Sequence, residues 1–317
     1  SRRRHTRYIS VTGVQTCALP ILLMRGTKNR TRQQIQDELQ RLNARVTATG
    51  GGNGAPVSAE GTMSASATIQ VPSNNFEATM KLVAEILREP SFPDNEFEQV
   101  KTQRLRALEV APTEPGQIAP DELSRYLSPL AKGNPLYGPT REEMLAEMQK
   151  VTLEDVRKFH AQFYGASYAE LAVVGPLTQP EVQRIGQSTL GNWTTSVPYR
   201  RLFSEYKQFA PINRKIETPD KANAQFEAAV RVKMNDASPD YPAIVLANYI
   251  LGGTISGRVP DRIRNREGLS YSVRTNFGAP TEGDAAMFSM FAISNPANTP
   301  KAEASFLDEL QIGRAHV

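Results

Sequence analysis

Apolar positions recur at helical spacing through most of the first half of the chain, and short alternating segments interrupt them. The first helix is predicted from a capping box, in which Thr31 and Gln34 precede Ile35, Leu39 and Leu42 on one face. The same signals predict helices at 74–87, 94–108, 120–127 and 140–148, and further helices that begin at 152 and at 178. Alternation predicts strands at 46–49, 57–59 and 64–71, whereas the continuous apolar run at 171–175 is typical of a buried strand.

A second set of elements follows a polar stretch at 194–217 that has few periodic apolar positions. Residues 224–232 and 285–293 alternate as strands do, and residues 239–251 and 257–266 have helical spacing. Gly268 stops the second of these helices, and a strand is predicted to begin at 269–273. Because strands and helices are segregated along the chain, the sequence predicts an α+β fold with helices packed on a mainly antiparallel sheet.

The predicted organisation is a first domain at 23–193, a linker at 194–217 and a second domain at 218–310. The two domains echo one another in sequence. Thr27 precedes a helix and the strand that begins at Val46, and Thr254 precedes a helix and Val273, with 19 residues from threonine to valine in each case. Both threonines follow a glycine. We therefore expect two similar domains, each a sheet covered by helices on one face.

The two ends of the chain differ from the body. We predict that segments 1–22 and 311–317 are foreign, artefactual tails. A secretory signal is the alternative for the first tail, because an Arg-rich start precedes an apolar run from Cys17 to Met24. Pro20 interrupts that run, which is shorter than the ~20 residues that a membrane span needs, so no membrane span is predicted. Cys17 is the only cysteine, which leaves the body without disulfides or thiol catalysis.

The basic charge of the chain comes from these two ends. The chain has 37 Lys and Arg against 33 Asp and Glu, and five of the arginines lie in the tails. Removing those five leaves 32 basic against 33 acidic residues in the body. A nearly neutral body lacks the basic face that a nucleic-acid surface needs, and it gives no case for electrostatic membrane binding.

Candidate chemistry is concentrated in LGGTISGRVPDRIRNREGLSYSV, residues 251–273. Arg264 is predicted on the last turn of a helix and Tyr271 in the strand that follows, seven residues later. A guanidinium and a phenol brought together there can grip a peptide carbonyl and stabilise negative charge that develops on it. Spacing alone also fits a surface arginine and a half-buried strand tyrosine, because short motifs are only hypotheses.

This R-x6-Y segment resembles the second half of the insulinase, pitrilysin and mitochondrial processing peptidase family (peptidase family M16). Three further stretches resemble the same family in the same order: LLMRGTKNRTRQQIQDELQRLNARV at 22–46, AEILREPSFPDNEFEQVKTQRLRALE at 84–109 and VTLEDVRKFHAQFYGASYAELAVVG at 151–175. The resemblance covers 22–310. It implies two domains of the M16-type metallohydrolase fold, of which the second is incomplete.

The resemblance also implies where a zinc motif, H-x-x-E-H, would lie, and this chain departs from the family there. Cys17 to Leu22 occupy the expected place, and the expected position of the last ligand falls on Ala107, with Glu109 close by. The three histidines, His5, His160 and His316, include no pair close enough to chelate a metal from one helix. We predict no metal site in this chain, and we interpret His160 as an ordinary helix residue.

The resemblance implies a clamshell of two halves, one of which holds zinc while the other encloses the peptide. We expect this chain to be the non-catalytic half, inactive alone, with Arg264 and Tyr271 as substrate-binding and oxyanion residues. Its partners would be a peptide substrate and a catalytic half, fused or separate, that carries the zinc. The alternatives are an inert M16-like scaffold or binding subunit, and an independent peptidase that uses Glu109 and His160. Related long bacterial chains are often exported, which favours the bacterial periplasm.

Overall fold

The computed structural model describes residues 21–50, 65–128, 130–134, 136–195, 197–198 and 202–312 of the chain. These residues form two compact units. The described parts of 21–50, 65–110 and 131–202 belong to the first unit, and those of 111–130 and 203–312 belong to the second. The domain boundaries expected from the sequence stay a prediction, and the structure adds that residues 111–130 pack in the second unit.

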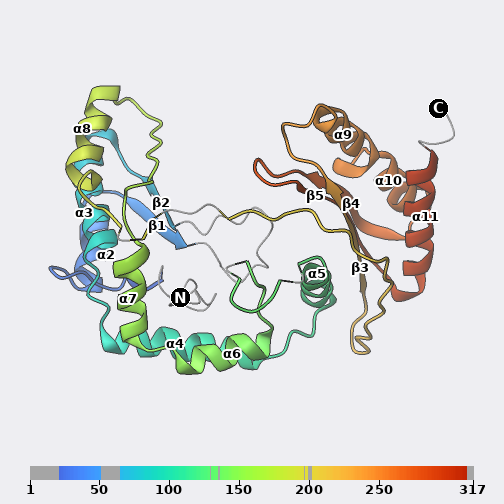
Figure 1. Ribbon diagram of the computed structural model, residues 1–317, viewed down its shortest axis with the longest axis horizontal. Helices are drawn as coiled ribbons and strands as arrows, with labels where there is room; N and C mark the ends of the chain where they lie inside the picture. The colour runs from blue at the N-terminus through green and yellow to red at the C-terminus, as the bar shows by residue number, and fades with distance from the viewer. Residues whose placement is uncertain are drawn as a thin grey trace, which may run out of the picture. The chain divides into compact units, whose positions relative to one another are not determined.

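The first unit combines a two-stranded antiparallel sheet with helices (Figure 1). Strand β1 pairs with β2 in a register that places Val46 opposite Ile69. The elements described in this unit are β1 (Arg45–Gly50), β2 (Ala65–Gln70), η1 (Ser73–Asn75), α2 (Arg32–Arg41), α3 (Phe76–Arg88), α4 (Asp94–Glu109), α6 (Arg141–Lys150), α7 (Leu153–Phe163) and α8 (Gln179–Leu190).

Helix starts in this unit follow the capping boxes that the sequence predicts. The side chain of Thr31 accepts a hydrogen bond from the backbone N–H of Gln34, and Gln34 Oε1 accepts one from the backbone N–H of Thr31. Thr152 and Asp155 repeat this exchange at the start of α7. Each box satisfies backbone donors that a helix terminus leaves unpaired, which fixes where the helix begins. The predictions for these two starts are confirmed.

The core of the first unit draws on helices from both ends of its sequence. Leu22 and Leu23 are fully buried and pack with side chains of α3, α4, α6 and α7. Leu22, which lies in the segment predicted as the first tail, belongs to this core. Gln311 and Ile312, which lie in the segment predicted as the second tail, are part of a helix that begins at Thr299. The foreign origin of both tails stays a prediction.

One strand expected in the first unit is absent from the described residues, and another falls outside them. The run at 171–175 was predicted as a buried strand, but it pairs with neither β1 nor β2 and has no strand conformation. Leu171 is 42% exposed and Val174 is fully exposed, so the apolar run alone did not secure a place inside the sheet. The strand predicted at 57–59 lies outside the described residues.

The second unit is a three-stranded antiparallel sheet in the order β3-β5-β4 (Figure 1). Its buried core joins Val259 and Ile263 to Met290 and Ala292 of β5 and to Phe306, which is fully buried. The helices that supply this core lie on one face of the sheet (Figure 1). The elements are β3 (Ala224–Lys233), β4 (Ser270–Gly278), β5 (Ala285–Ser294), α9 (Tyr241–Asn248), η2 (Tyr249–Gly253), α10 (Arg258–Pro260), η3 (Asp261–Arg266), η4 (Pro296–Asn298) and α11 (Thr299–Ile312).

Helix α5 (Pro115–Tyr126) completes the second unit and lies against β3. Ion pairs from Lys221 to Glu114 and from Arg214 to Glu122 link it to the chain that leads into the sheet. The hydroxyl of Tyr126 donates a hydrogen bond to the backbone oxygen of Ala210. These contacts explain why residues 111–130 belong to this unit although they precede much of the first unit in sequence.

The observed fold agrees with the predicted class: α+β, with antiparallel sheets and helices. The predicted helices at 239–251 and 257–266 each end in a segment with π-helical hydrogen bonding, η2 and η3. Helix α11 was not predicted from the sequence. Among the described residues, no helix combines the length and the apolar character that crossing a bilayer requires.

Candidate functional site

The structure places Arg264 in η3, a segment whose wider winding ends the α10–η3 helix. Gly268 follows with a φ of +62°, a left-handed conformation that glycine adopts without strain. The backbone N–H of Leu269 donates to the oxygen of Ile263, which ties the turn back to the helix. The chain then enters β4 at Ser270. Short π-helical segments occur often at functional sites, which makes this turn a candidate on geometry.

Tyr271 lies at an irregularity in the pairing of β4 with β5. Ser270 is opposite Ser294, and Ser272 is opposite Ile293, so two residues separate the β4 positions while one separates the β5 positions. Tyr271 is the additional residue of this β-bulge. Bulges re-aim side chains and are frequent beside active sites. Accordingly, Tyr271 is 82% exposed although it lies inside a strand.

The structure brings the two predicted site residues together. The guanidinium carbon of Arg264 lies 4.6 Å from the centre of the Tyr271 ring, a cation–π contact. Arg264 is half-buried and Tyr271 is exposed, so the phenol hydroxyl lies at a solvent-accessible surface. The predicted proximity is thus observed, with the ring face rather than the hydroxyl against the guanidinium.

Arg264 differs from its arginine neighbours in its partners. Arg262 forms ion pairs with three carboxylates, those of Glu267, Asp308 and Glu309. Arg266 is paired with Asp261 and Arg258 with Glu309. Within the described part of the chain, Arg264 has neither an ion pair nor a hydrogen bond. Its five N–H donors therefore remain available to an acceptor such as a carbonyl or carboxylate.

The carboxylates around Arg262 hold α11 against η3. Hydrogen bonds to Glu267 and Asp308 are the largest causes that raise the pKa of Arg262 above its ordinary value. The hydroxyl of Ser305 on α11 also donates to Glu267, whose pKa is lowered by Ser305 and Arg262 in spite of its partial burial. This network fixes the helix that carries Arg264 without drawing Arg264 itself into an ion pair.

The other predicted candidates do not form a site. In the described residues no three His, Cys, Asp or Glu side chains gather as a metal would require. His160 Nε2 lies 2.7 Å from the backbone oxygen of Leu87, and because a carbonyl only accepts, this nitrogen must carry the proton. Its ring packs on Phe92 and Tyr164, and burial lowers its pKa. His160 is a half-buried packing residue here, and among the described residues no hydrogen bond or ion pair joins it to Glu109 at the end of α4.

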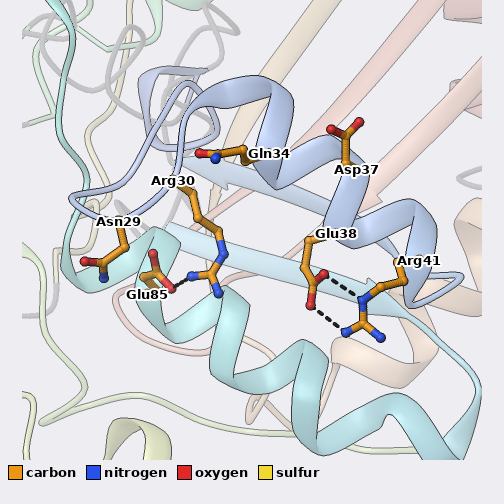
Figure 2. Close-up of a pocket in the computed structure, with 7 residues that line it drawn as sticks. All are labelled: Asn29, Arg30, Gln34, Asp37, Glu38, Arg41 and Glu85. Carbon is orange, nitrogen blue, oxygen red and sulfur yellow. Dashed lines mark hydrogen bonds and ion pairs between the residues drawn. The ribbon is translucent and has the colours of Figure 1, made fainter.

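A hollow of about 690 Å³ lies on the first unit between α2 and α3, and Figure 2 shows its lining side chains. Two arginines contribute to it, and each is already paired: Arg30 with Glu85, and Arg41 with Glu38. The hydrogen bond from Arg41 lowers the pKa of the Glu38 carboxyl. Both arginines are held by carboxylates of the hollow itself, and Asp37 accepts a hydrogen bond from Gln33, so no cluster of unpaired cations is left for a ligand among these lining residues.

Comparison with known proteins gives two matches to family models. The model described as the peptidase M16 inactive domain matches residues 150–312, and the model of the insulinase family, peptidase M16, matches residues 19–140. One protein relative, the non-peptidase homolog YmxG of Helicobacter pylori, is 28% identical over 200 residues. That alignment covers 61% of this chain and 44% of the relative, so the chain spans less than half of that protein.

Solved structures match over nearly the whole chain. The peptidase M16 inactive domain from Pseudomonas fluorescens has a TM-score of 0.73 at 21% identity, covering 96% of this chain and 71% of that one. A protease from Helicobacter pylori has a TM-score of 0.69 at 14% identity, covering 97% and 76%. The periplasmic protease PqqL from Escherichia coli scores 0.68 at 13% identity, covering 96% and 32%. At these identities the likeness concerns the fold, and Arg264 and Tyr271 both lie within the stretch that matches the inactive-domain model.

Proposed function

We propose that this chain, which belongs to the M16 peptidase family, is the non-catalytic half of a zinc endopeptidase. Its second half matches the inactive domain of that family, and its sequence contains no H-x-x-E-H motif. In this proposal the chain encloses the peptide substrate, while another half, fused or separate, holds the zinc. Arg264 and Tyr271 are its contribution to the shared active site.

The observation that carries the proposal is the exposed contact between Arg264 and Tyr271. A tyrosine whose only role was to pack would be expected to bury its ring, yet Tyr271 is 82% exposed and is held under a guanidinium. This exposed phenol lies beside a cation that has no carboxylate partner in the described residues. Such a pair suits an oxygen atom that gains negative charge during a reaction.

The two side chains would divide the work on a bound peptide. The guanidinium of Arg264 would donate hydrogen bonds to a backbone carbonyl or carboxylate of the substrate and hold it in place. The phenol of Tyr271 would donate one hydrogen bond to the oxygen of the tetrahedral intermediate, where the interaction is stronger than in the ground state. The residues described in this chain do not fit a zinc ion, so the zinc belongs to the partner half in this proposal.

A catalytically inert M16-like scaffold or binding subunit is the second candidate. It is favoured by one finding, the similarity to a relative described as a non-peptidase homolog. The two candidates differ in what they require of Arg264 and Tyr271. A scaffold needs its fold and its docking surfaces, and it gains nothing from an exposed arginine and phenol held together at a strand bulge.

The deciding experiment is Tyr271→Phe in a peptidase assembled from this chain and an M16 half that carries H-x-x-E-H. Loss of one oxyanion donor typically lowers kcat by about 10²–10³-fold. We expect a fall of this order with a smaller change in KM, since the hydroxyl acts mainly in the transition state. Tyr249→Phe is the matched control, because Tyr249 is 61% exposed in the same unit and has no cation beside it in the described residues.

Two results would decide against the catalytic role. If Tyr271→Phe leaves kcat equal to that of the Tyr249→Phe control, Tyr271 is no oxyanion donor. If in addition Arg264→Gln leaves KM unchanged while the two halves still associate, the chain serves as a scaffold. Stoichiometric, tight zinc binding by the purified chain alone would instead revive an independent peptidase.

A further inference from the structure

The bulge at Tyr271 changes which residues of β4 face the core. Before the bulge Ser270 lies opposite Ser294, and after it Val273 lies opposite Ala292. Val273 packs in the core of the second unit together with Ala292 and Met290. Without the additional residue, Ser272 would be opposite Ala292 and Val273 would turn to the other face of the sheet, because side chains alternate along a strand.

Ser270 is the buried residue on which this bulge closes. It is 5% exposed, and its hydroxyl lies 2.6 Å from the backbone oxygen of Ile293 and 2.9 Å from that of Ser272. A serine hydroxyl has one proton to donate, so the two carbonyl oxygens share it. One acceptor belongs to the partner strand and the other to the residue just after Tyr271. The hydroxyl therefore connects the residue after the bulge with the partner strand.

These contacts constrain the direction in which the Tyr271 side chain leaves the backbone. Its backbone lies between Ser270, which donates, and Ser272, whose carbonyl accepts. The Arg264 guanidinium, 4.6 Å from the ring centre, defines the position that the ring must reach. On the helix side, Gly268 and the hydrogen bond from Leu269 to Ile263 set the distance between η3 and β4.

We infer that Ser270 is a positioning residue: its buried hydroxyl holds the β-bulge that presents Tyr271 to Arg264. The role of the pair in catalysis rests on the proposed function, whereas the positioning itself is a property of this chain. Ser270 does not touch the substrate in this inference. It acts by fixing the backbone on both sides of Tyr271.

The chain offers a matched control for the loss of a buried hydroxyl. Ser294 lies directly opposite Ser270, is 4% exposed, and its hydroxyl pairs with that of Thr299 at the start of α11. Ser294→Ala and Ser270→Ala therefore remove the same group from equally buried sites of one strand pair. Only Ser270→Ala removes a hydrogen bond to the bulge.

The experiment is fluorine NMR of the chain labelled with 3-fluorotyrosine. The signal of residue 271 among the ten tyrosines is the one lost in Tyr271→Phe, and its sensitivity to Arg264→Gln reports the contact. We expect Ser270→Ala to move this signal to the position seen in Arg264→Gln and to abolish its response to that substitution. Ser270→Thr, which keeps the hydroxyl, and Ser294→Ala should both retain the signal and the response.

Signals of Tyr206, Tyr241 and Tyr249 report whether the second unit stays folded. The inference is overturned if Ser270→Ala leaves the 271 signal in place, or if Ser294→Ala moves it equally. It is also overturned if Ser270→Ala shifts all the tyrosine signals of the unit together, since the hydroxyl would then serve general stability. None of these outcomes depends on peptidase activity, so a failed catalytic role for Tyr271 would be recognised separately by unchanged kcat.

Discussion

Gly252 in η2 packs closely against β4, which predicts the effect of adding a side chain there. A Cβ atom added at Gly252 would lie 2.8 Å from Thr275 Oγ1, 2.9 Å from its Cγ2 and 3.2 Å from its backbone nitrogen. Gly252 and Thr275 are both buried, and Gly257 packs directly on Gly252. We expect Gly252→Ala to push η2 away from β4.

The magnitude follows from two opposing effects. Alanine is favoured over glycine in a helix by about 0.8–1.0 kcal/mol. Overpacking a filled interior costs about 1–3 kcal/mol. Three contacts near or below 3 Å, one of them to backbone, place Gly252 at the upper end of that range, so the expected net loss of stability is roughly 1–2 kcal/mol.

Gly186→Ala in α8 is the matched control. A Cβ there meets only Leu171 Cδ2, at 3.1 Å. That atom is the far end of a flexible side chain, and Leu171 is 42% exposed, so it can move aside. With little overpacking to oppose it, helix propensity should make this variant neutral or more stable. The difference between the two variants isolates the cost of contact with Thr275.

The assay must separate the two compact units, because a chain of two units need not unfold in one step. Trp193, the only tryptophan, lies in the first unit and reports its unfolding in urea by fluorescence. Hydrogen exchange of the β4 and β5 amides reports the second unit. Gly252→Ala should lower protection there and leave the Trp193 transition unchanged.

A second substitution tests the cause. Thr275→Ala removes both side-chain atoms that the new methyl group would meet, and Thr275 Oγ1 has no hydrogen-bond partner among the described residues. The double variant should therefore recover part of the loss, with a coupling of about 1 kcal/mol. Equal protection of β4 in Gly252→Ala and the parent chain, or purely additive effects in the double variant, would refute the reasoning.

Two further predictions concern pH and association. Burial lowers the pKa of His160 below its ordinary value of 6.5, so the unfolded chain takes up the proton first and the free energy of unfolding of the first unit should fall as the pH drops below 6.5. His160→Gln should flatten that slope between pH 5 and pH 7 in urea titrations followed at Trp193, and equal slopes would contradict the assignment. Leu246 and Ile250 are more than half exposed on the α9–η2 helix, which has no charged residue. We therefore expect the isolated chain to self-associate through this apolar face, and Leu246→Gln with Ile250→Gln to lower that association in sedimentation. Leu307→Gln on α11 is the control, and an equal effect there would exclude a specific face.

Local signals in the sequence predicted the elements whose stability is local. The boxes at Thr31 and Thr152 placed two helix starts because their hydrogen bonds lie within four residues. The alternation at 64–71 placed β2, which has one apolar and one polar face. The segment at 285–293 placed β5 although both faces of that strand are mainly apolar. The run at 171–175 had the composition of a strand, yet a strand also needs a partner for its backbone, which no local pattern can supply.

The candidate site shows the same division between local and tertiary information. Spacing allowed Arg264 and Tyr271 to meet but also fitted a surface arginine and a separate strand tyrosine. In the structure a helix end, one glycine turn and a strand start bring the two side chains together. The bulge leaves no mark in the local pattern: Leu269, Tyr271 and Val273 alternate as in a regular strand, and the register shift appears only in the pairing with β5. The role of Ser270 depends on that pairing and has no local signal for the same reason.

The arginines next to Arg264 have carboxylate partners, whereas Arg264 has an aromatic one. Four carboxylates bind Arg258, Arg262 and Arg266, and two of them, those of Asp308 and Glu309, come from α11, for which the sequence pattern carries no prediction. Arg264 is excluded from this network because it faces β4, where the bulge supplies an aromatic ring instead of a carboxylate. A ring attracts the cation weakly, by about 0.5–1 kcal/mol at an exposed site, whereas a carboxylate would occupy its donors. The arrangement holds the guanidinium in place while leaving its hydrogen-bonding capacity for a substrate, which a purely structural arginine would have no reason to keep.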